Sequence, residues 1–530
     1  MSIPGRIYDL ALRGLRGIAP YVVGGSGKVG RGVEGRRRDR GTFREWAEEH
    51  RDPERPLVWF HAPSVGEGLQ ARAVLDALRR ERPDVQLAYS FFSPSAEGMA
   101  RRLQVDVAAY LPWDVQVEVG PTLDALRPDL VVFTKTEVWP GLTAAARRRG
   151  VPVLLVAATL PPNAGRLRWP GRLLLRRTFR VLERVVTISA EDGARFQELG
   201  VRPDRVAVAG DPAMDAVLER VRATDPEAPY LRALLAGPPA LMTLVAGSTW
   251  GPDEEVLIPA VTGLREVLKA RGGTRGEERG TGGTRGADES PGTDEPRRTV
   301  EPPGSASEGA GTSGPDRADP ATDSPIPLRI IIAPHEPDAE HLEPLEARLR
   351  TFGWETQRLS RRVAPPSNRA GDDPGPPLAE AIIIDRVGVL AELYTLADVA
   401  FVGGGFGTDG LHSVLEPAAA GVPVLFGPNH HNARAAGELE SVGGGLSVAD
   451  EDSLLRALRM WVPARARDPA DSRGVGPSVR GTDSAESGSA RHHAGTTARR
   501  YLEAHQGASS ATARILDDLI SHTRSSKDAT

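Results

Sequence analysis

The chain has 530 residues and no cysteine. The absence of cysteine excludes a disulfide framework, a cysteine-based zinc site and a thiol nucleophile. The net charge of -5 is small for this length, so it gives no chain-wide reason to expect a nucleic-acid partner. No run of about 18 apolar residues is present to span a bilayer, and no compact apolar region precedes a small-residue cleavage site of the secretory type.

Short apolar runs alternate with helix-length segments along the chain. Strands buried on both faces look continuously apolar, as these runs do, so the alternation predicts parallel sheets covered by helices. Because the length is too great for one ordinary core, we expect an α/β protein with two Rossmann-like domains facing across a cleft. The predicted strands are 57–60, 85–89, 130–133, 153–157, 184–188 and 206–209 in the first half and 242–246, 329–333, 381–385, 399–402 and 422–426 in the second.

The predicted boundaries follow this rhythm. Residues 46–225 form the first domain, residues 240–462 the second, and residues 499–522 a pair of closing helices. Three stretches rich in Gly, Pro, Thr and charged residues have too few large apolar side chains to fold, so we predict disordered insertions there. They are residues 272–327, 361–377 and 463–498.

Residues 1–45 carry an apolar stripe at helical spacing, followed by a cluster of basic residues that includes Arg36, Arg37, Arg38 and Arg40. An amphipathic segment with a basic flank is typical of a peripheral membrane anchor. An ordinary helix that packs on its own domain has the same pattern. Both interpretations stay open on the sequence alone. The stripe consists of Ile7, Ala11, Leu15, Ile18 and Val22.

The turn after the first predicted strand runs from His61 to Gly68 and carries Ser64, Gly66 and Glu67. Open α/β sheets bind ligands at the carboxyl ends of their strands, and a general base needs a carboxylate placed within reach of its substrate. Glu67 is therefore a candidate catalytic base. The alternative is that Glu67 only complements the dipole of the following helix, a role worth ~0.5 kcal/mol.

Glu137 follows the strand 130–133 in the same way, so it is expected at the same edge of the sheet. The alternative is a helix start, with Thr136 as the capping residue and Pro140 in the first turn. The two interpretations are compatible with each other. Two acidic residues would then face one cleft.

The second half has loops at the edge where a nucleotide would lie. Ser248 follows its first strand, and Pro334 and His335 follow the next. His335 could stack on a base or hydrogen-bond to it, although a lone histidine in such a loop is often structural. His430 and His431 lack the acidic or histidine partners of a metal site, so we expect no catalytic metal.

The strand 399–402 leads into a glycine-rich loop, residues 403–407, and then toward a helix start near Leu415. Glycines let a backbone approach a phosphate, and the free amides of a helix start favour its charge. Glu416 is placed to accept hydrogen bonds from ribose hydroxyls. No Gly-Lys-Ser or Gly-Lys-Thr closes the loop, so it is not a P-loop.

With these motifs assembled, the chain resembles the 3-deoxy-D-manno-octulosonic acid (Kdo) transferases, glycosyltransferases with the two-Rossmann-domain (GT-B) architecture that build the inner core of lipopolysaccharide. The resemblance runs in order through both halves. The matching stretches are 61–67, 136–140, 246–249, 403–405, 415–419 and 426–428.

The resemblance implies an inverting transfer of Kdo from CMP-Kdo to the lipid A precursor, lipid IVA, without a metal or other cofactor. It implies a peripheral or monotopic protein at the cytoplasmic leaflet of the inner membrane. Glu67 would be the base, Glu137 would support the transition state, and Ser64 and Gly66 would form the acceptor turn. The implied CMP-sugar residues are Ser248, Pro334, His335, Val387, Gly388, Val389, Gly404, Gly405, Ser413, Val414, Leu415 and Glu416.

Three positions depart from the family pattern by lacking a cation. Ala213 stands where the family usually has a lysine that would meet the leaving phosphate, and Thr159 and His335 stand where arginines are common. Compensation by Lys135, Arg166 or Arg168 is our preferred interpretation. Two alternatives stay open: a transferase of the same fold with another nucleotide sugar, and a catalytically impaired protein that binds nucleotide or lipid.

Overall fold

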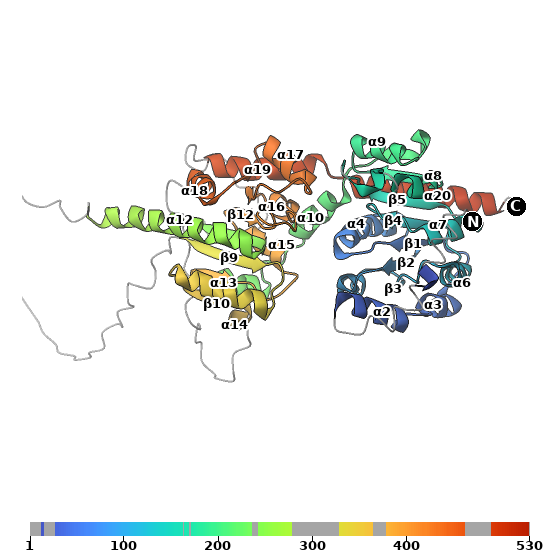
Figure 1. Cartoon of the computed structure of the whole chain (residues 1–530), viewed down its shortest axis with the longest axis horizontal. Helices are drawn as coiled ribbons and strands as arrows, with labels where there is room; N and C mark the ends of the chain where they lie inside the picture. Colours follow the sequence, from blue (N-terminus) through green and yellow to red (C-terminus); the bar gives the residue numbers. More distant parts are fainter. Residues whose placement is uncertain are drawn as a thin grey trace, which may run out of the picture.

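The computed structural model describes residues 12–14, 27–162, 164–168, 171–235, 242–277, 328–363, 378–461 and 489–528. Two α/β lobes lie side by side, the first containing β1 to β7 and the second β8 to β14 (Figure 1). Each lobe has a seven-stranded sheet in which every pair of neighbours is parallel.

The first sheet has the order β3-β2-β1-β4-β5-β6-β7. Its first four strands in the sheet are fully or largely buried, because helices cover both faces. The strands are β1 (Leu57–His61), β2 (Gln86–Phe91), β3 (Val107–Tyr110), β4 (Leu130–Thr134), β5 (Val153–Ala158), β6 (Arg184–Thr187) and β7 (Val206–Val208). The helices are α2 (Lys28–Arg38), α3 (Thr42–His50), α4 (Val65–Glu81), α5 (Glu97–Ala100), α6 (Gln116–Leu126), α7 (Pro140–Arg148), α8 (Gly171–Arg180) and α9 (Ala190–Glu198).

The second sheet has the order β10-β11-β9-β8-β12-β13-β14. Its strands are β8 (Thr243–Thr249), β9 (Arg329–Pro334), β10 (Thr356–Arg358), β11 (Ala381–Ile383), β12 (Val399–Val402), β13 (Val424–Phe426) and β14 (Gly445–Ser447). Its helices are α11 (Pro229–Leu235), α12 (Gly251–Glu277), α13 (Ala339–Thr351), α14 (Leu359–Val363), α15 (Leu390–Leu393), α16 (Leu415–Ala419), α17 (Arg434–Ser441) and α18 (Glu451–Met460).

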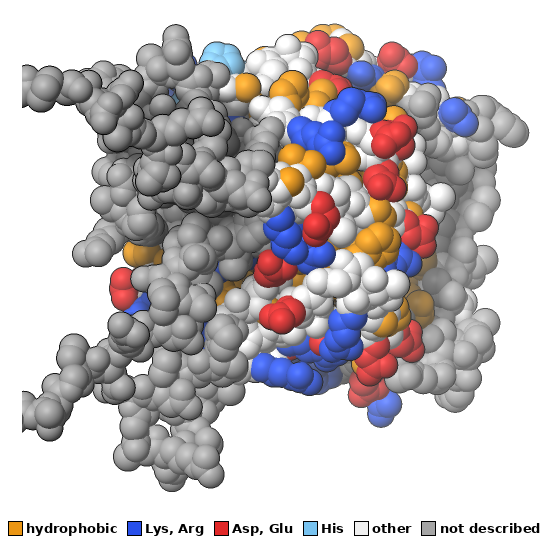
Figure 2. Space-filling model, turned by 90° about the vertical axis from the view of Figure 1, so that its left-hand side faces the viewer, with side chains coloured by type: hydrophobic (Ala, Val, Ile, Leu, Met, Phe, Trp, Pro, Cys, Tyr) orange, Lys and Arg blue, Asp and Glu red, His pale blue; other side chains and the backbone are white. Residues whose placement is uncertain are grey.

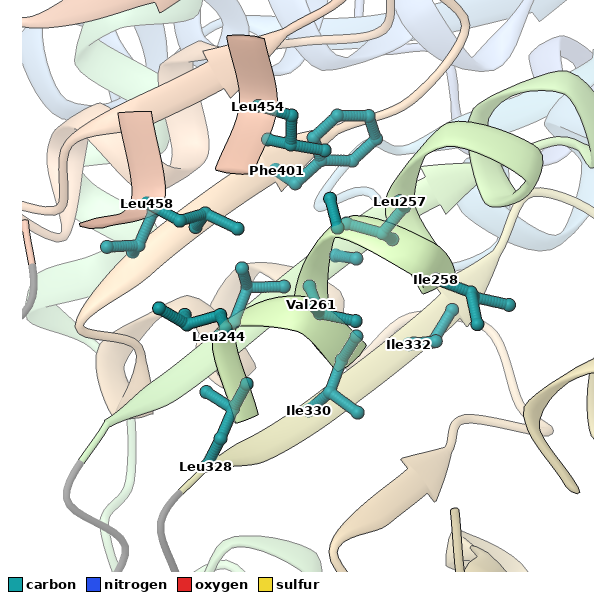
Figure 3. Close-up of a cluster of buried hydrophobic side chains, with 14 of the residues drawn as sticks. Leu244, Leu257, Ile258, Val261, Leu328, Ile330, Ile332, Phe401, Leu454 and Leu458 are labelled. Atoms are coloured by element: carbon teal, nitrogen blue, oxygen red, sulfur yellow. The ribbon is translucent and has the colours of Figure 1, made fainter. Parts of the chain in front are cut away.

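The core of the second lobe shows why these segments fold together. Side chains of α12, Leu257 and Val261 among them, lie over Leu244 of β8 and Ile330 of β9, and α18 closes the layer from the side (Figure 3). These residues are fully buried. Burying a Leu, Val or Ile side chain contributes ~1.5 to 3 kcal/mol, so this layer is a main source of the lobe's stability.

The predicted fold class is confirmed, and each of the predicted strands corresponds to a strand of the structure. Three strands were not predicted: β3, β10 and β14. All three are short and lie at an open edge of a sheet. Strands β10 and β14 are only partly buried, so fewer of their side chains need to be apolar and their pattern in the sequence is weak. Strand β3 has four apolar residues and was missed because it is short.

Two helices connect the lobes. Helix α10 (Pro212–Arg222) follows the first sheet, and its Met214, Val217 and Leu218 join a core cluster of the second lobe. Helix α20 (Ala508–Asp528) returns to the first lobe, where Leu516 and Ile520 are buried beside α4 (Figure 1). The chain therefore passes between the lobes twice.

The predicted insertion at residues 463–498 differs from the structure at its end, because α19 (Ser489–Ala504) begins inside it. Ala494 and Ala498 are buried at helical spacing with Leu502, and small alanines give a weak apolar signal in sequence. Helices α12 and α14 likewise extend a few residues into the other two predicted insertions. The remainder of the three segments lies outside the described residues.

The apolar stripe predicted within residues 1–45 lies outside the described residues. The basic flank is partly engaged by the protein: the guanidinium of Arg36 lies 3.8 Å above the Phe92 ring, and Arg38 pairs with Glu97 at 2.9 Å. Burial lowers the pKa of Arg36 to about 10. For the basic flank, whose Arg36 and Arg38 lie in α2, packing on the first lobe is therefore the better of the two interpretations. Among the helices that the structure describes, none is long and apolar enough to cross a membrane.

Candidate functional site

The turn between β1 and α4 holds Glu67 in the first helical turn. Ser64 is the N-cap residue, but its side chain makes no capping hydrogen bond; the hydroxyl instead donates to the Glu67 carboxylate. The ammonium of Lys135 lies 4.0 Å from the same carboxylate. A Cβ on Gly66 would meet no atom within 4 Å, so the turn has open space beside it. Ser64 therefore orients a carboxylate instead of capping the helix.

Glu137 lies in the connection between β4 and α7, outside any helix or strand. The prediction that Thr136 caps this helix is wrong, because the N-cap is Trp139 and the Asp114 carboxylate accepts from the Gly141 amide at 2.7 Å. Pro140 is in the first turn, as expected. Glu137 is thus not needed to begin the helix.

Glu137 lies beside Arg166, with 3.4 Å between guanidinium nitrogen and carboxylate oxygen. Burial raises the pKa of Glu137, the Arg166 charge opposes this rise, and the negative charge of Glu67 adds to it. The structure therefore places both predicted glutamates within electrostatic reach at one sheet edge. A hollow of about 150 Å³ opens there, lined by Thr136, Glu137, Val138, Trp139, Pro140, Arg166, Leu175 and Phe179.

His61 ends β1 directly beneath this edge and is fully buried. Its Nδ1 lies 3.0 Å from the Ser90 hydroxyl, and its ring meets the Trp139 ring edge-on at 5.9 Å. Burial lowers the pKa of His61 to about 3, so the imidazole is neutral. A neutral ring packed in this way supports the position of Trp139 in the wall of the hollow.

The glycine loop after β12 differs from the expected open phosphate cradle. The buried carboxylate of Asp253 accepts from the amides of Gly404 at 2.8 Å and Phe406 at 3.1 Å. A Cβ on Gly404 would lie 2.2 Å from the Gly410 oxygen, and one on Gly405 would lie 2.6 Å from the Gly427 nitrogen. The glycines thus permit close packing of backbone segments, and a carboxylate of the protein occupies two of the amides.

The helix expected after this loop, α16, begins at Leu415 and has only five residues. Glu416 in its first turn has an enclosed Oε2 without a hydrogen-bond partner. Burial raises the pKa of Glu416, while a hydrogen bond from the Ser413 side chain and the charge of Arg220 oppose the rise. Because Oε2 is closed to solvent, it does not itself offer a contact to a ribose hydroxyl, and the predicted contact stays a prediction.

Arg220 of α10 was not singled out from the sequence, yet it supports this region. Its guanidinium donates to the carbonyl of Gly388 at 2.9 Å and pairs with Glu392 at 3.0 Å. The predicted residues Gly388 and Glu416 thus share one neighbouring cation. Val387 is 77% exposed and Val389 is buried, so only one of these two apolar side chains is available to a ligand on the surface.

Three aromatic side chains meet at the carboxyl edge of the second sheet. The His335 ring stacks on His412 at 4.3 Å and lies 4.7 Å from Trp250, whose indole nitrogen donates to His412 at 3.3 Å. Burial lowers the pKa of His412 to about 4. Trp250 and His412 were missed as site residues because only the pairing of β8 with β9 and β12 brings them to His335. Pro334 ends β9, and Ser248 has a left-handed φ of 55° beside this edge.

One group of described side chains is close enough together to hold a metal ion. It comprises Glu336, Asp338 and His341, whose candidate ligand atoms lie within 4.8 Å of one another. Nδ1 of His341 already contacts the Asp338 carboxylate at 3.0 Å, and Asp338 caps α13. The absence of a catalytic metal stays a prediction.

Comparison with known proteins places these motifs in a family context. Residues 36–216 match the family described as 3-Deoxy-D-manno-octulosonic-acid transferase (kdotransferase). A 3-deoxy-D-manno-octulosonic acid transferase of Bordetella pertussis is 27% identical over 457 residues, which cover 84% of this chain and 86% of that protein. Proteins of the same name from Chlamydophila psittaci and Aquifex aeolicus are 24% and 22% identical and each cover 76% of this chain, with 76% and 84% of their own lengths.

Among solved structures, MurG of Acinetobacter baumannii is 14% identical with a TM-score of 0.44, covering 87% of this chain and 99% of its own. UDP-GlcNAc 2-epimerase of Methanocaldococcus jannaschii is 13% identical with a TM-score of 0.45, covering 84% of this chain and 99% of its own.

Proposed function

We propose that this chain is a glycosyltransferase of lipopolysaccharide synthesis that transfers Kdo from CMP-Kdo to a lipid A precursor, lipid IVA, with inversion. Support comes from its similarity to Kdo transferases over most of its length. The observation that carries this proposal is the pair of glutamates at the edge of the first sheet. Glu67 is oriented by the Ser64 hydroxyl, and Glu137 has a pKa raised by burial.

In the proposed reaction, the Glu67 carboxylate takes the proton from an acceptor hydroxyl. The acceptor oxygen then bonds to the anomeric carbon of Kdo while the bond from that carbon to the CMP oxygen breaks, and the electron pair leaves with CMP. Glu137 stabilises the positive charge that develops on the sugar. No metal or cofactor enters this scheme, which uses only the donor and the acceptor.

The donor is proposed to lie on the second lobe. Base stacking on the cluster of Trp250, His335 and His412 would resemble the aromatic stacking by which proteins hold nucleobases, worth ~1 to 3 kcal/mol per base. The Glu416 carboxylate would accept from the ribose. Gly404 and Gly405 are less direct candidates, because Asp253 already occupies the Gly404 amide.

Because the proposed acceptor is a membrane lipid, the protein has to reach the membrane surface. We propose the cytoplasmic leaflet of the inner membrane, with peripheral association. Support comes from the amphipathic pattern of the first 45 residues and from the basic side chain of Arg166, which lines the hollow. Sedimentation with anionic vesicles, with and without residues 1–26, tests this part separately.

The main experiment is mass spectrometry of the product formed by purified protein, CMP-Kdo and lipid IVA. We expect the mass of the acceptor to rise by whole Kdo units and the product to vanish in Glu67→Ala. Glu81→Ala, exposed at the far end of the same helix, is the matched control and should keep wild-type turnover. Full activity in Glu67→Ala would exclude the assigned base.

A second candidate function is transfer of another nucleotide sugar, and the observation in its favour is Ala213 in place of the family's usual lysine. Calorimetry with CMP, UDP and GDP separates the two, because the Kdo proposal requires CMP to bind most tightly. Binding of CMP without turnover on any lipid acceptor would instead favour a catalytically impaired protein.

A further inference from the structure

Lys135 has an unusual backbone conformation at the carboxyl end of β4. Its φ of 68° is left-handed, which is uncommon for residues other than glycine and is retained when surrounding structure imposes it. Here the imposing contacts come from β5 and the loop after it: the Lys135 amide donates to Val156 at 2.9 Å, and its carbonyl accepts from Thr159 at 3.3 Å. The backbone of Lys135 is therefore fixed from both sides.

The side chain of Lys135 reaches α4, the helix that carries Glu67. Its ammonium lies 4.0 Å from the Glu67 carboxylate and is 40% exposed. Its charge also acts on Asp211, where it helps to oppose the rise in pKa that burial causes. Lys135 thus lies between the proposed base and the first residues of α10.

Ala213 lies among these first residues of α10. The Asp211 carboxylate accepts from the Ala213 amide at 2.9 Å and from the side chain of Gln70 at 2.9 Å. Gln70 is one helical turn beyond Glu67 on α4, so the same face of α4 reaches both Lys135 and Asp211. Contacts through Glu67 and Gln70 of α4 thus lead from Lys135 to Asp211 and Ala213, although Ala213 is 78 residues away from Lys135 in sequence.

The other two candidate cations are placed differently. Arg166 pairs with Glu137 and lines the hollow next to Leu175 and Phe179. Arg168 is exposed. Of the three, Lys135 is the one whose charge reaches Asp211, next to Ala213.

We propose that Lys135 is the cation that meets the phosphate of the departing nucleotide, in place of the lysine that the resembling family carries at the position of Ala213. This inference rests on the proposed function. A fixed ammonium near the leaving phosphate stabilises the charge that grows there as the sugar bond breaks.

The absence of cysteine makes a direct chemical test possible. In Lys135→Cys the only thiol of the chain is at position 135. Treatment with 2-bromoethylamine restores a side chain of lysine length with its ammonium, whereas iodoacetamide gives a similar length without charge. Both products carry their new group on the same cysteine sulfur at position 135, so the two modified proteins differ chiefly in the charge of that side chain.

We expect Lys135→Cys to lower kcat/KM for CMP-Kdo by ~10 to 100-fold, as loss of a charge-assisted contact to phosphate does. Aminoethylation should recover most of this loss, and carbamidomethylation should not. In a second variant pair, Ala213→Lys in the Lys135→Ala background should recover activity partly by returning the charge to the family's position. Arg168→Ala, which removes an exposed nearby cation, should leave kcat/KM within twofold of wild type.

Equal recovery with both reagents, or recovery with neither, would overturn the assignment of Lys135, and so would wild-type kinetics in Lys135→Cys. These outcomes differ from failure of the proposed function itself. If the unmodified wild-type protein does not turn over CMP-Kdo, the donor assignment fails whatever the variants show.

Discussion

At the scale of single residues, the contact between Ser64 and Glu67 separates a catalytic turn from a capping turn. We expect Ser64→Ala to lower kcat about tenfold, because the lost hydrogen bond to a charged group is worth ~1.5 kcal/mol or more. The free energy of unfolding should change by less than ~0.5 kcal/mol, since Ser64 caps no amide. Kinetics and urea denaturation on the same sample measure both quantities.

Ser189 is the matched control, because it is also a helix N-cap but does accept from a helix amide, that of Asp192 at 3.1 Å. Ser189→Ala should lose ~1 kcal/mol of unfolding free energy and keep its kcat. If Ser64→Ala lost as much unfolding free energy as Ser189→Ala, Ser64 would be a helix cap and not a residue that orients Glu67.

The charge of Arg166 controls the ionisation of Glu137. Burial and Glu67 raise the pKa of Glu137, and Arg166 is the neighbour that lowers it. In Arg166→Gln this pKa should rise further, so the carboxylate is lost at a higher pH as the solution is acidified. The acidic limb of the kcat/KM profile should move to higher pH.

Arg168→Gln serves as the control for this pH profile, since Arg168 is exposed two positions away. Its acidic limb should coincide with that of the wild type. An unchanged limb in Arg166→Gln would mean that Glu137 does not titrate in the step observed.

At the scale of helices and strands, what the sequence could predict depended on how continuous each apolar signal is. Buried central strands such as β1 and β4 were predicted because all their side chains are apolar or enclosed. The glutamates after them were found for the same reason. The hydrogen bonds from the glycine loop to the Asp253 carboxylate could not be predicted. Asp253 is about 150 residues away from the loop in sequence, and the two meet only because β8 pairs with β12.

The first ten residues of α19, 489–498, were predicted as part of an insertion, and the reason is one of packing that can be tested. Ala498 is fully buried, and its Cα would lie only 2.8 Å from a Cβ placed on Gly444. We expect Ala498→Leu to lower the free energy of unfolding by ~1 to 3 kcal/mol, because the enclosed site has no room for the added carbons. Urea denaturation measures the loss. Arg500→Leu, exposed on the same helix, should stay within ~0.5 kcal/mol of wild type, and an equal loss in both variants would contradict tight packing.

At the scale of the whole molecule, the two-lobed plan was predictable because the strand-helix rhythm restarts after residue 240. The crossing of α20 back to the first lobe was not, since an amphipathic helix does not reveal which lobe it covers. Contacts between the lobes therefore had to come from the structure. Figure 2 shows the end of the molecule formed by the second lobe, where acidic and basic side chains are intermixed on the described surface.

Among the residues that the structure describes, an ion-pair group joins the lobes outside the connecting helices. The Arg434 guanidinium of α17 lies 3.4 Å from Asp192 and 3.7 Å from Glu191, both at the start of α9 in the first lobe. Because Arg434 is about half exposed, salt should screen the attraction. The pair therefore acts as a weak, salt-sensitive restraint on the angle between the lobes.

We expect Arg434→Gln to broaden the distribution of distances between fluorophores placed one on each lobe, and to raise the KM for CMP-Kdo by about two- to fivefold, in keeping with the ~0.2 to 1 kcal/mol of an exposed pair such as that with Glu191. At 1 M salt the variant and the wild type should converge, since the charge attraction is then screened in both. Arg202→Gln, which breaks an exposed pair with Asp204 inside the first lobe, should leave both measurements unchanged. A difference that persists at 1 M salt would show that Arg434 acts through packing instead of charge.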